Sequence, residues 1–181
     1  NLALIREGKV IRTGCLNVGG RLVRFDEQGR IIYVSPALTG LTDLKVGDLA
    51  EEGNLWPIAR LLAAALETAA GRSSHPIPEG LFTEEAENRW EPTEEAVTVS
   101  FSGGVADCME KAQDWRRYGD MGVLLGRAIR ESRLCSGDYR LGTETIRATV
   151  IGAGCHSVQL SGSTVFSQNL RFPMKNIPAV V

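Results

Sequence analysis

The sequence is poor in the residues that build metal centres and has no segment suited to crossing a membrane. Only 2 of its 181 residues are His and 4 are Cys. The cysteines lie far apart and form no Cys-x-x-Cys pair, so the ligand spacing of a zinc ribbon is missing. No apolar run approaches the roughly 20 residues of a membrane span. We therefore expect no metal site, no membrane partner, and reduced, mostly buried thiols at Cys15, Cys108, Cys135 and Cys155.

The charge balance argues against a nucleic-acid partner. Lys and Arg number 20 against 22 Asp and Glu, which gives a formal net charge of -2. The positive side chains are spread along the chain, whereas nucleic-acid-binding proteins gather theirs into a patch or stripe. No secretory leader pattern opens the chain. We expect a cytoplasmic protein.

The remaining composition is that of an ordinary globular domain. Hydrophobic residues make up 43% of the chain and charged residues 23%, and the length suits one domain over residues 1–181. Such a chain buries roughly two-thirds of the surface that its unfolded form exposes. It begins without Met and directly in a strand-like pattern, Asn1-Leu2-Ala3-Leu4-Ile5. We therefore expect a fragment of a longer protein.

Residues 1–35 predict an antiparallel meander. Glu7-Gly8 separates two apolar runs and is a good two-residue hairpin turn, because Gly adopts a positive φ without steric penalty. A longer loop over residues 26–29 joins two further strand patterns, and Pro36 ends the second of them.

Helical patterns and a Pro-rich segment follow. Apolar side chains recur at helical spacing after Pro57 as far as Gly71, then over residues 123–132 and again over 146–160. Residues 72–96 contain three Pro and the acidic stretch Glu84-Glu85-Ala86-Glu87. This segment predicts an exposed insertion with a solvated charged surface.

The strongest candidate site is the turn formed by Ser102, Gly103, Gly104 and Val105. It follows Val97–Phe101, a β-branched and aromatic run typical of a buried central strand. Successive glycines let a ligand pack on the main chain, and a following helix would present free N–H groups. Many strand-to-helix turns contain Gly-Gly for purely local reasons, so the turn alone does not establish a site.

A second glycine pair, Gly19 and Gly20, also follows a strand pattern and is by itself as consistent with a tight bend as with a site. Neither pair belongs to a Gly-x-Gly-x-x-Gly or P-loop motif. No Gly-x-Ser-x-Gly motif is present, and His156 adjoins Cys155 too closely to assume a Cys-His dyad. We predict no catalytic residue in this chain.

The order of these motifs resembles the second half of the EutA family, the ethanolamine ammonia-lyase reactivating factors. The resemblance is carried by the turns Asn-Val-Gly-Gly-Arg and Phe-Ser-Gly-Gly-Val, by residues 147–156, and by the closing stretches 160–166 and 171–178. It spans nearly the whole chain and is weakest over residues 37–96. Among these motifs, those near the end of the chain are the most specific.

The resemblance implies the C-terminal lobe of an actin/Hsp70-like ATPase. The expected fold is ribonuclease-H-like α/β, with a mixed sheet covered by helices. Ser102, Gly103, Gly104 and Val105 would face the adenosine of ATP, and Gly19 and Gly20 would lie near its phosphates. The phosphate-binding hairpins and the acidic groups that position Mg²⁺ would belong to the missing N-terminal lobe, so this chain alone should be inactive.

By the same resemblance, the partners are that N-terminal lobe and ethanolamine ammonia-lyase, in which damaged cobalamin is exchanged for adenosylcobalamin. The resemblance also allows association with a bacterial microcompartment. Three alternatives stay open: an interaction module with little or no nucleotide role, an independent small enzyme, and another actin-like family such as the diol dehydratase reactivases. A catalytic set within residues 1–181 would be needed for the second, and none is found.

Overall fold

The computed structural model describes residues 1–83, 97–110 and 114–142, all of which belong to one compact unit, Asn1–Ala148. The acidic stretch, the predicted helix over 146–160 and the closing strands lie outside the described residues, as does the second unit, Thr149–Val181. The described part is a mixed α/β arrangement with antiparallel and parallel strand pairs, as expected for the fold class. Within it, no helix is both long and apolar enough to cross a bilayer.

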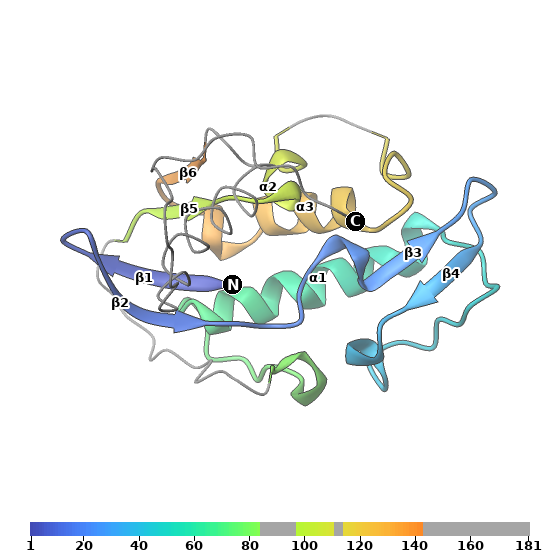
Figure 1. Cartoon of the computed structure of the whole chain (residues 1–181), viewed down its shortest axis with the longest axis horizontal. Helices are drawn as coiled ribbons and strands as arrows, with labels where there is room; N and C mark the ends of the chain where they lie inside the picture. The colour runs from blue at the N-terminus through green and yellow to red at the C-terminus, as the bar shows by residue number, and fades with distance from the viewer. Residues whose placement is uncertain (84–96, 111–113, 143–181) are drawn as a thin grey trace, which may run out of the picture. The chain divides into compact units, whose positions relative to one another are not determined.

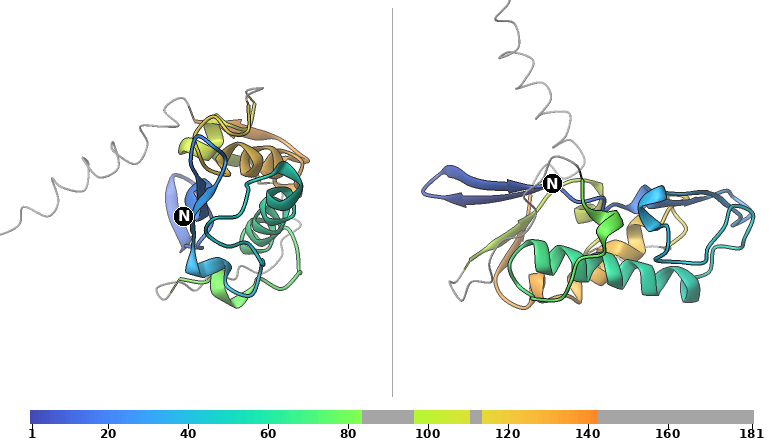
Figure 2. Two further views of the ribbon diagram at one scale, coloured as in Figure 1. Left: turned by 90° about the vertical axis from the view of Figure 1, so that its right-hand side faces the viewer. Right: turned by 90° about the horizontal axis from the view of Figure 1, so that it is seen from below.

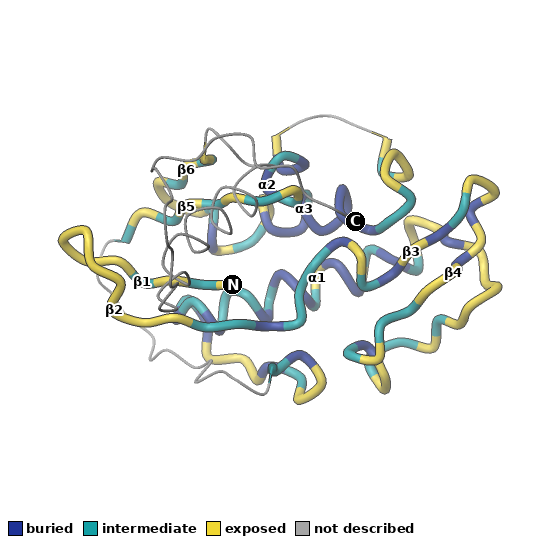
Figure 3. The backbone as a smooth tube through the Cα atoms, in the orientation of Figure 1, coloured by how far each residue is buried: buried dark blue, intermediate teal, exposed yellow. Residues whose placement is uncertain are grey.

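Two packed helices form the core of the unit. Helix α1 spans Glu52–Ala69 and helix α3 spans Gly122–Arg130 (Figure 1). Their facing sides are buried along most of their length (Figure 3). The predicted apolar face of α3 is confirmed, since its members are at most 5% exposed: Leu124, Leu125, Ala128 and Ile129.

Helix α1 begins before the predicted start. It starts at Glu52, so Pro57 lies inside the helix, where its ring removes one backbone hydrogen bond. A capping box compensates at the start: the side chain of Asn54 accepts from the Glu51 N–H at 2.9 Å, and that of Glu51 accepts from the main chain of the first turn. The predicted end is confirmed, because Gly71 adopts φ +69° just after the helix.

The predicted meander is two separate hairpins rather than one sheet. Strands β1 (Leu2–Arg6) and β2 (Lys9–Gly14) pair with each other, as do β3 (Val23–Phe25) and β4 (Ile31–Val34). Both predicted turns are confirmed; Glu7 and Gly8 adopt φ +51° and +73°, as a tight hairpin requires. The hairpins lie toward opposite ends of α1 (Figures 1 and 2).

The chain between the two hairpins is held by another segment, which explains why β2 and β3 do not pair. Leu16 forms an antiparallel bridge with Phe82, and the Asn17 N–H donates to the Leu81 carbonyl at 2.8 Å. A short 3₁₀ helix, Gly20–Leu22, then leads into β3. The backbone groups that a continuous meander would use are therefore engaged elsewhere.

The same contacts correct the prediction of an exposed insertion over residues 72–96. Its described part, residues 72–83, contributes to the core: Ile77 is 5% exposed and Leu81 0%. A 3₁₀ helix, Glu79–Leu81, follows Pro78 and places Leu81 beneath the chain that joins β2 to β3. Pro78 leads into this packed turn, whereas Ser74, His75 and Pro76 are exposed, so within the described part the prediction is wrong only around Ile77 and Leu81.

The predicted central strand is shorter and less buried than expected. Strand β5 spans Val99–Phe101 and pairs in parallel with β6, Tyr139–Leu141, a strand that the sequence pattern did not predict. Val99 and Phe101 are half-buried and Ser100 is exposed, so β5 is not a central buried strand within the described residues. The chain then turns into α2, Gly104–Asp107, which packs on α3.

Candidate functional site

A cavity of about 610 Å³ lies where β1, β5 and the turn after β5 approach the ends of α1 and α3. This volume is within the usual range of small-molecule pockets. Its described walls are mostly apolar, with contributions from Leu66 of α1 and from Leu125 and Ile129 of α3. The cavity combines an apolar interior with a few polar groups, which is the usual composition of a ligand site.

The cavity brings together both glycine turns singled out in the sequence. Ser102, Gly103, Gly104 and Val105 line it, and so does Gly19. Gly20 is the exception among the six candidate residues and is not one of its described lining residues. Two segments far apart in sequence therefore face one space.

The two glycines of the later turn differ in their backbone. Gly103 adopts φ +90° and ψ 174°, a region that is essentially restricted to glycine. Gly104 is the first residue of α2 and has no such restriction. A Cβ added at either position would meet nothing within 4 Å, so the main chain of this turn is open on its cavity side.

The two glycines of the earlier turn differ in how closely they pack against other parts of the chain. Gly20 is buried, and a Cβ there would lie 2.5 Å from Cα and 2.8 Å from N of Gly122 in α3. Gly19 has open space around it and an extended backbone that any residue can adopt. Gly20 is therefore required for packing on α3, while Gly19 leaves main chain exposed to the cavity.

Helix α2 does not supply the anion-binding N-terminus expected after the glycine turn. It has only four residues, too few for an appreciable macrodipole. Its first turn is partly closed by its own bonds, since the Ala106 N–H donates to the Gly103 carbonyl at 3.1 Å. The turn therefore offers open space and main-chain groups to a ligand, but not the positive electrostatic potential of a long helix N-terminus.

Three positive side chains, Arg6, Arg12 and Arg72, line the cavity, and no Asp, Glu, His or Cys is among its described lining residues. None of the three was predicted from the sequence. The strand pattern of residues 2–6 could have indicated Arg6, because Arg6 shares a strand face with Leu2 and Leu4. The charged side chains among the described lining residues are therefore all arginines.

The titratable groups with shifted pKa values lie outside the cavity. Burial raises the pKa of the Cys135 thiol, Arg130 opposes this and Glu110 adds to it. That thiol stays protonated at neutral pH and is a weak nucleophile. A hydrogen bond to Glu110 raises the pKa of Tyr139. Within residues 1–83, 97–110 and 114–142 no group of three His, Cys, Asp or Glu is close enough to hold a metal ion.

The described residues form a mixed α/β domain with a cavity of small-molecule size. A family model described as "Ethanolamine utilisation protein EutA" matches residues 1–181. The chain belongs to this family, which separates it from the diol dehydratase reactivases. No solved structure matches it.

Two curated relatives match over the whole chain. One, from Salmonella typhimurium (strain LT2), is 36% identical over 188 residues, and the other, from Escherichia coli (strain K12), is 31% identical over 191 residues. Each is named "Ethanolamine ammonia-lyase reactivase EutA". The chain spans 40% of the length of each of these relatives.

Proposed function

We propose that this chain is the nucleotide-clamping lobe of an ethanolamine ammonia-lyase reactivating factor with an actin/Hsp70-like, ribonuclease-H-type fold. The main support for the proposal is that two glycine turns, at Gly19 and at Gly103-Gly104, line the same mostly apolar cavity. The parallel pair β5–β6 and the strand–turn–helix order around Gly103 support the fold assignment. The names of the two relatives support the reactivase role.

The cavity suits a nucleoside in three respects. Its apolar walls can pack on a purine base, its volume is that of a small-molecule site, and the Ser102 hydroxyl offers a hydrogen bond to a ribose. The open space beside Gly104 lets a ligand approach the main chain more closely than a side chain would allow. In the proposal, this lobe binds the adenosine part of ATP.

Mg²⁺ and hydrolysis need groups beyond those described here. Mg²⁺ is held by carboxylates, phosphates and water, and the described lining of the cavity contains no carboxylate. The missing N-terminal lobe would contribute these groups. The described residues then bind and orient the nucleotide, and we expect no turnover from this chain alone.

In the full-length protein, nucleotide state would change the angle between two lobes that close on the ligand. A ligand shifts such an equilibrium only by its difference in affinity for the open and closed states. Ethanolamine ammonia-lyase would be the partner that responds, releasing damaged cobalamin so that adenosylcobalamin replaces it. The role of this lobe is to make ATP affinity depend on closure.

The test is Gly104→Val in the full-length protein, with ATP affinity measured by calorimetry. The two added methyl groups should fill cavity space and weaken binding about tenfold, or 1.4 kcal/mol. The melting temperature should hardly change, because Gly104 has an unrestricted backbone and open surroundings. Gly53→Val is the matched control, since Gly53 lies in the first turn of α1 with equally open surroundings and away from the described cavity lining.

Unchanged ATP affinity in a normally folded Gly104→Val protein would remove the glycine turn from the site. If the wild-type protein binds the lyase but no nucleotide, the interaction-module alternative is correct.

A further inference from the structure

The hairpin β3–β4 and the segment beside it expose a group of apolar side chains. The segment is residues 46–49, which bonds to the main chain of Ile31 on β4 through two N–H···O bonds of 2.8 Å. Two side chains of β4 and two of this segment are 42% to 67% exposed: Ile32, Tyr33, Val46 and Leu49. Single exposed apolar side chains are common, whereas a group of them on adjacent segments marks an interaction site. We call these four residues the outer patch.

A β-bulge turns Tyr33 toward the outer patch. Phe25 pairs with Ile31 and Arg24 pairs with Tyr33, so Ile32 is an extra residue on β4. In a regular strand Tyr33 would share the face of Ile31, which is 1% exposed. Because of the bulge, Tyr33 shares the outward face of Arg24 instead. The hairpin thus uses a local irregularity to expose an aromatic side chain that regular pairing would turn inward.

Two arginines accompany the outer patch on this face. Arg24 and Arg30 each lie directly opposite one of its members, and Arg30 donates from Nη1 to the Gly47 carbonyl at 3.2 Å. The carboxylates of Asp26 and Asp48 instead accept main-chain N–H bonds within their own turns. Aromatic residues and Arg are enriched in protein–protein interfaces. This face therefore fits a protein surface that carries carboxylates, and it fits a second copy of itself poorly, because like charges would meet.

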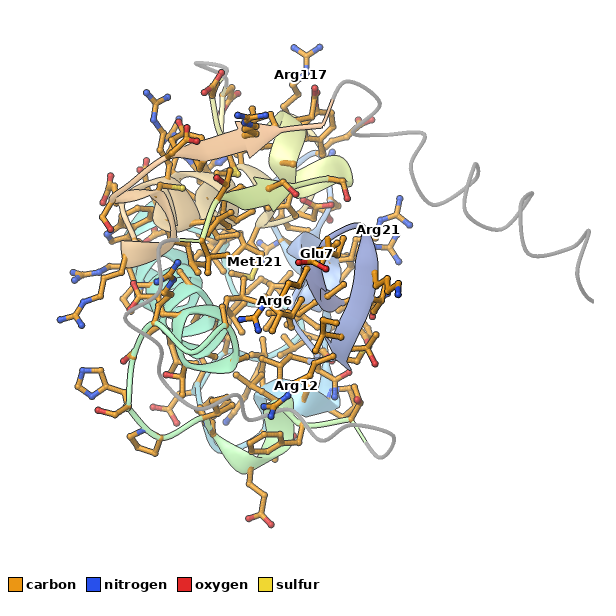
Figure 4. All side chains as sticks on the ribbon, turned by 90° about the vertical axis from the view of Figure 1, so that its left-hand side faces the viewer. Arg6, Glu7, Arg12, Arg21, Arg117 and Met121 are labelled. Carbon is orange, nitrogen blue, oxygen red and sulfur yellow. The ribbon has the colours of Figure 1, made fainter. Side chains whose placement is uncertain are left out.

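The outer patch lies far from the cavity. Helix α1 has 18 residues and is about 27 Å long. Ahead of its start, the Ala50 N–H donates to the Gly29 carbonyl of the β3–β4 loop at 2.8 Å, whereas Leu66 near its end lines the cavity. Figure 4 looks at the domain from the cavity end, where Glu7 and Arg12 mark the hairpin β1–β2. A lobe that closes on a nucleotide in the cavity would therefore leave the outer patch open to a partner.

We propose that the outer patch, with Arg24 and Arg30, is the surface through which this protein docks on ethanolamine ammonia-lyase. The matching lyase surface would be apolar at its centre and carry carboxylates at its rim. This inference rests on the lyase partner of the proposed function and deepens it by placing the contact. Nucleotide and lyase would then bind toward opposite ends of α1.

The experiment measures the affinity of the full-length protein for purified lyase by biolayer interferometry. The double variant Tyr33→Ser/Leu49→Ser should bind the lyase about tenfold or more weakly, because two apolar contacts are lost. Its melting temperature and ATP affinity should not change, since both side chains are exposed and lie outside the described cavity lining. The matched control is Val10→Ser/Ile11→Ser, at side chains of β2 that are 60% and 53% exposed, and it should bind the lyase normally. Arg24→Glu should weaken lyase binding more at low salt than at high salt.

A photo-cross-link identifies what covers the outer patch. The photoreactive residue p-benzoylphenylalanine replaces Val46, which is 67% exposed in the turn that the Asp48 N–H closes on the Lys45 carbonyl. Irradiation with the lyase present should give an adduct between the two proteins. An adduct with a second copy, or with another part of the same chain, would overturn the proposed docking surface.

Several outcomes separate this inference from the function on which it rests. Normal lyase affinity in both Tyr33→Ser/Leu49→Ser and Arg24→Glu would overturn the docking surface and leave the proposed function intact. Lyase binding that both variants weaken, in a wild type that binds no ATP, would support the docking surface and overturn the nucleotide role. A wild type that does not bind the lyase would overturn both. If the double variant melts at a lower temperature, Arg24→Glu and the cross-link decide the question.

Discussion

The two glycine pairs of this protein look alike in sequence but are required for different physical reasons. At Gly19-Gly20 the second glycine is fixed by packing, because a Cβ would lie 2.5 Å from the Gly122 backbone. At Gly103-Gly104 the first glycine is fixed by its backbone, which adopts φ +90° with open space around it. In each pair the other glycine, Gly19 or Gly104, is under neither constraint and lines the cavity.

This division separates the glycines that the fold requires from the glycines that it leaves unconstrained. Where the fold itself requires glycine, because any side chain would clash or strain the backbone, the presence of glycine says nothing about a ligand. A glycine that the fold does not require, and that faces a cavity, has main chain available for contact. Gly19 and Gly104 are therefore the informative members of their pairs.

The largest effect is expected for Gly20→Ala. The new Cβ would meet the backbone of α3, which cannot move aside as a flexible side chain can, and Gly20 is buried. We expect a loss of about 3 kcal/mol, the upper end of typical overpacking costs. This corresponds to roughly 6–12 °C in melting temperature. Thermal unfolding followed by circular dichroism measures it, and Gly53→Ala, in open space, should show no loss.

Gly103→Ala should cost less and in a different way. The residue meets no neighbour, so the penalty is backbone strain alone, roughly 2 kcal/mol. Replacement by Ser should cost nearly the same, because the strain arises at Cβ. At position 20 the loss should instead grow from Ala to Ser, as the volume grows. Equal Ala-to-Ser increments at the two positions, in urea unfolding, would contradict this separation of clash from strain.

Features that depend on local sequence were predicted correctly. Local signals sufficed for the Glu7-Gly8 turn, for the loop before β4 and for the buried face of α3, because each depends on a few neighbouring residues. Five of the six candidate site residues also line one cavity, while their contact with a ligand stays a prediction.

Long-range contacts account for what sequence reasoning missed. Leu81 is buried because the chain after β2 pairs across it, which a Pro-rich pattern does not reveal. Strand β6 exists through its parallel pairing with β5 and carries little signal of its own in three residues. The roles of Gly20 and Gly103 differ only through a tertiary neighbour in one case and a backbone angle in the other.

The unconstrained glycines should show almost no effect on stability. Gly19→Ala and Gly104→Ala should each change the free energy of unfolding by no more than about 0.5 kcal/mol, since neither creates a clash or a strained φ. ATP affinity, measured in parallel, should fall for both variants if the ligand rests on their main chain. A marked loss of stability at either position would show that the fold requires that glycine too, and the comparison within its pair would no longer point to a ligand.

The smallest effect concerns a titratable contact beside the later glycine turn. Tyr139 of β6 donates to the Glu110 carboxylate at 3.1 Å, and its ring meets Phe101 of β5 edge to face, with centroids 6.2 Å apart. The hydrogen bond to Glu110 raises the pKa of Tyr139 because it favours the protonated phenol. The contact should therefore stabilise the fold fully below the ordinary tyrosine range near pH 10 and be lost as the pH rises through the raised pKa.

Tyr139→Phe keeps the ring and removes the donor, so it isolates this contact. Its melting temperature should lie slightly below that of the wild type from pH 7 to 9, and the two should converge above the raised pKa. Tyr33→Phe, at a 42% exposed side chain of β4, is the control and should show no such convergence. Amide exchange near Gly103 should quicken at high pH more in the wild type than in Tyr139→Phe, while exchange near Gly20 should not distinguish them. If the difference in melting temperature between wild type and Tyr139→Phe persisted unchanged at pH 11, the hydroxyl group would stabilise the fold by some means other than donating its proton. Packing, as at the earlier turn, would then be what stabilises the later turn.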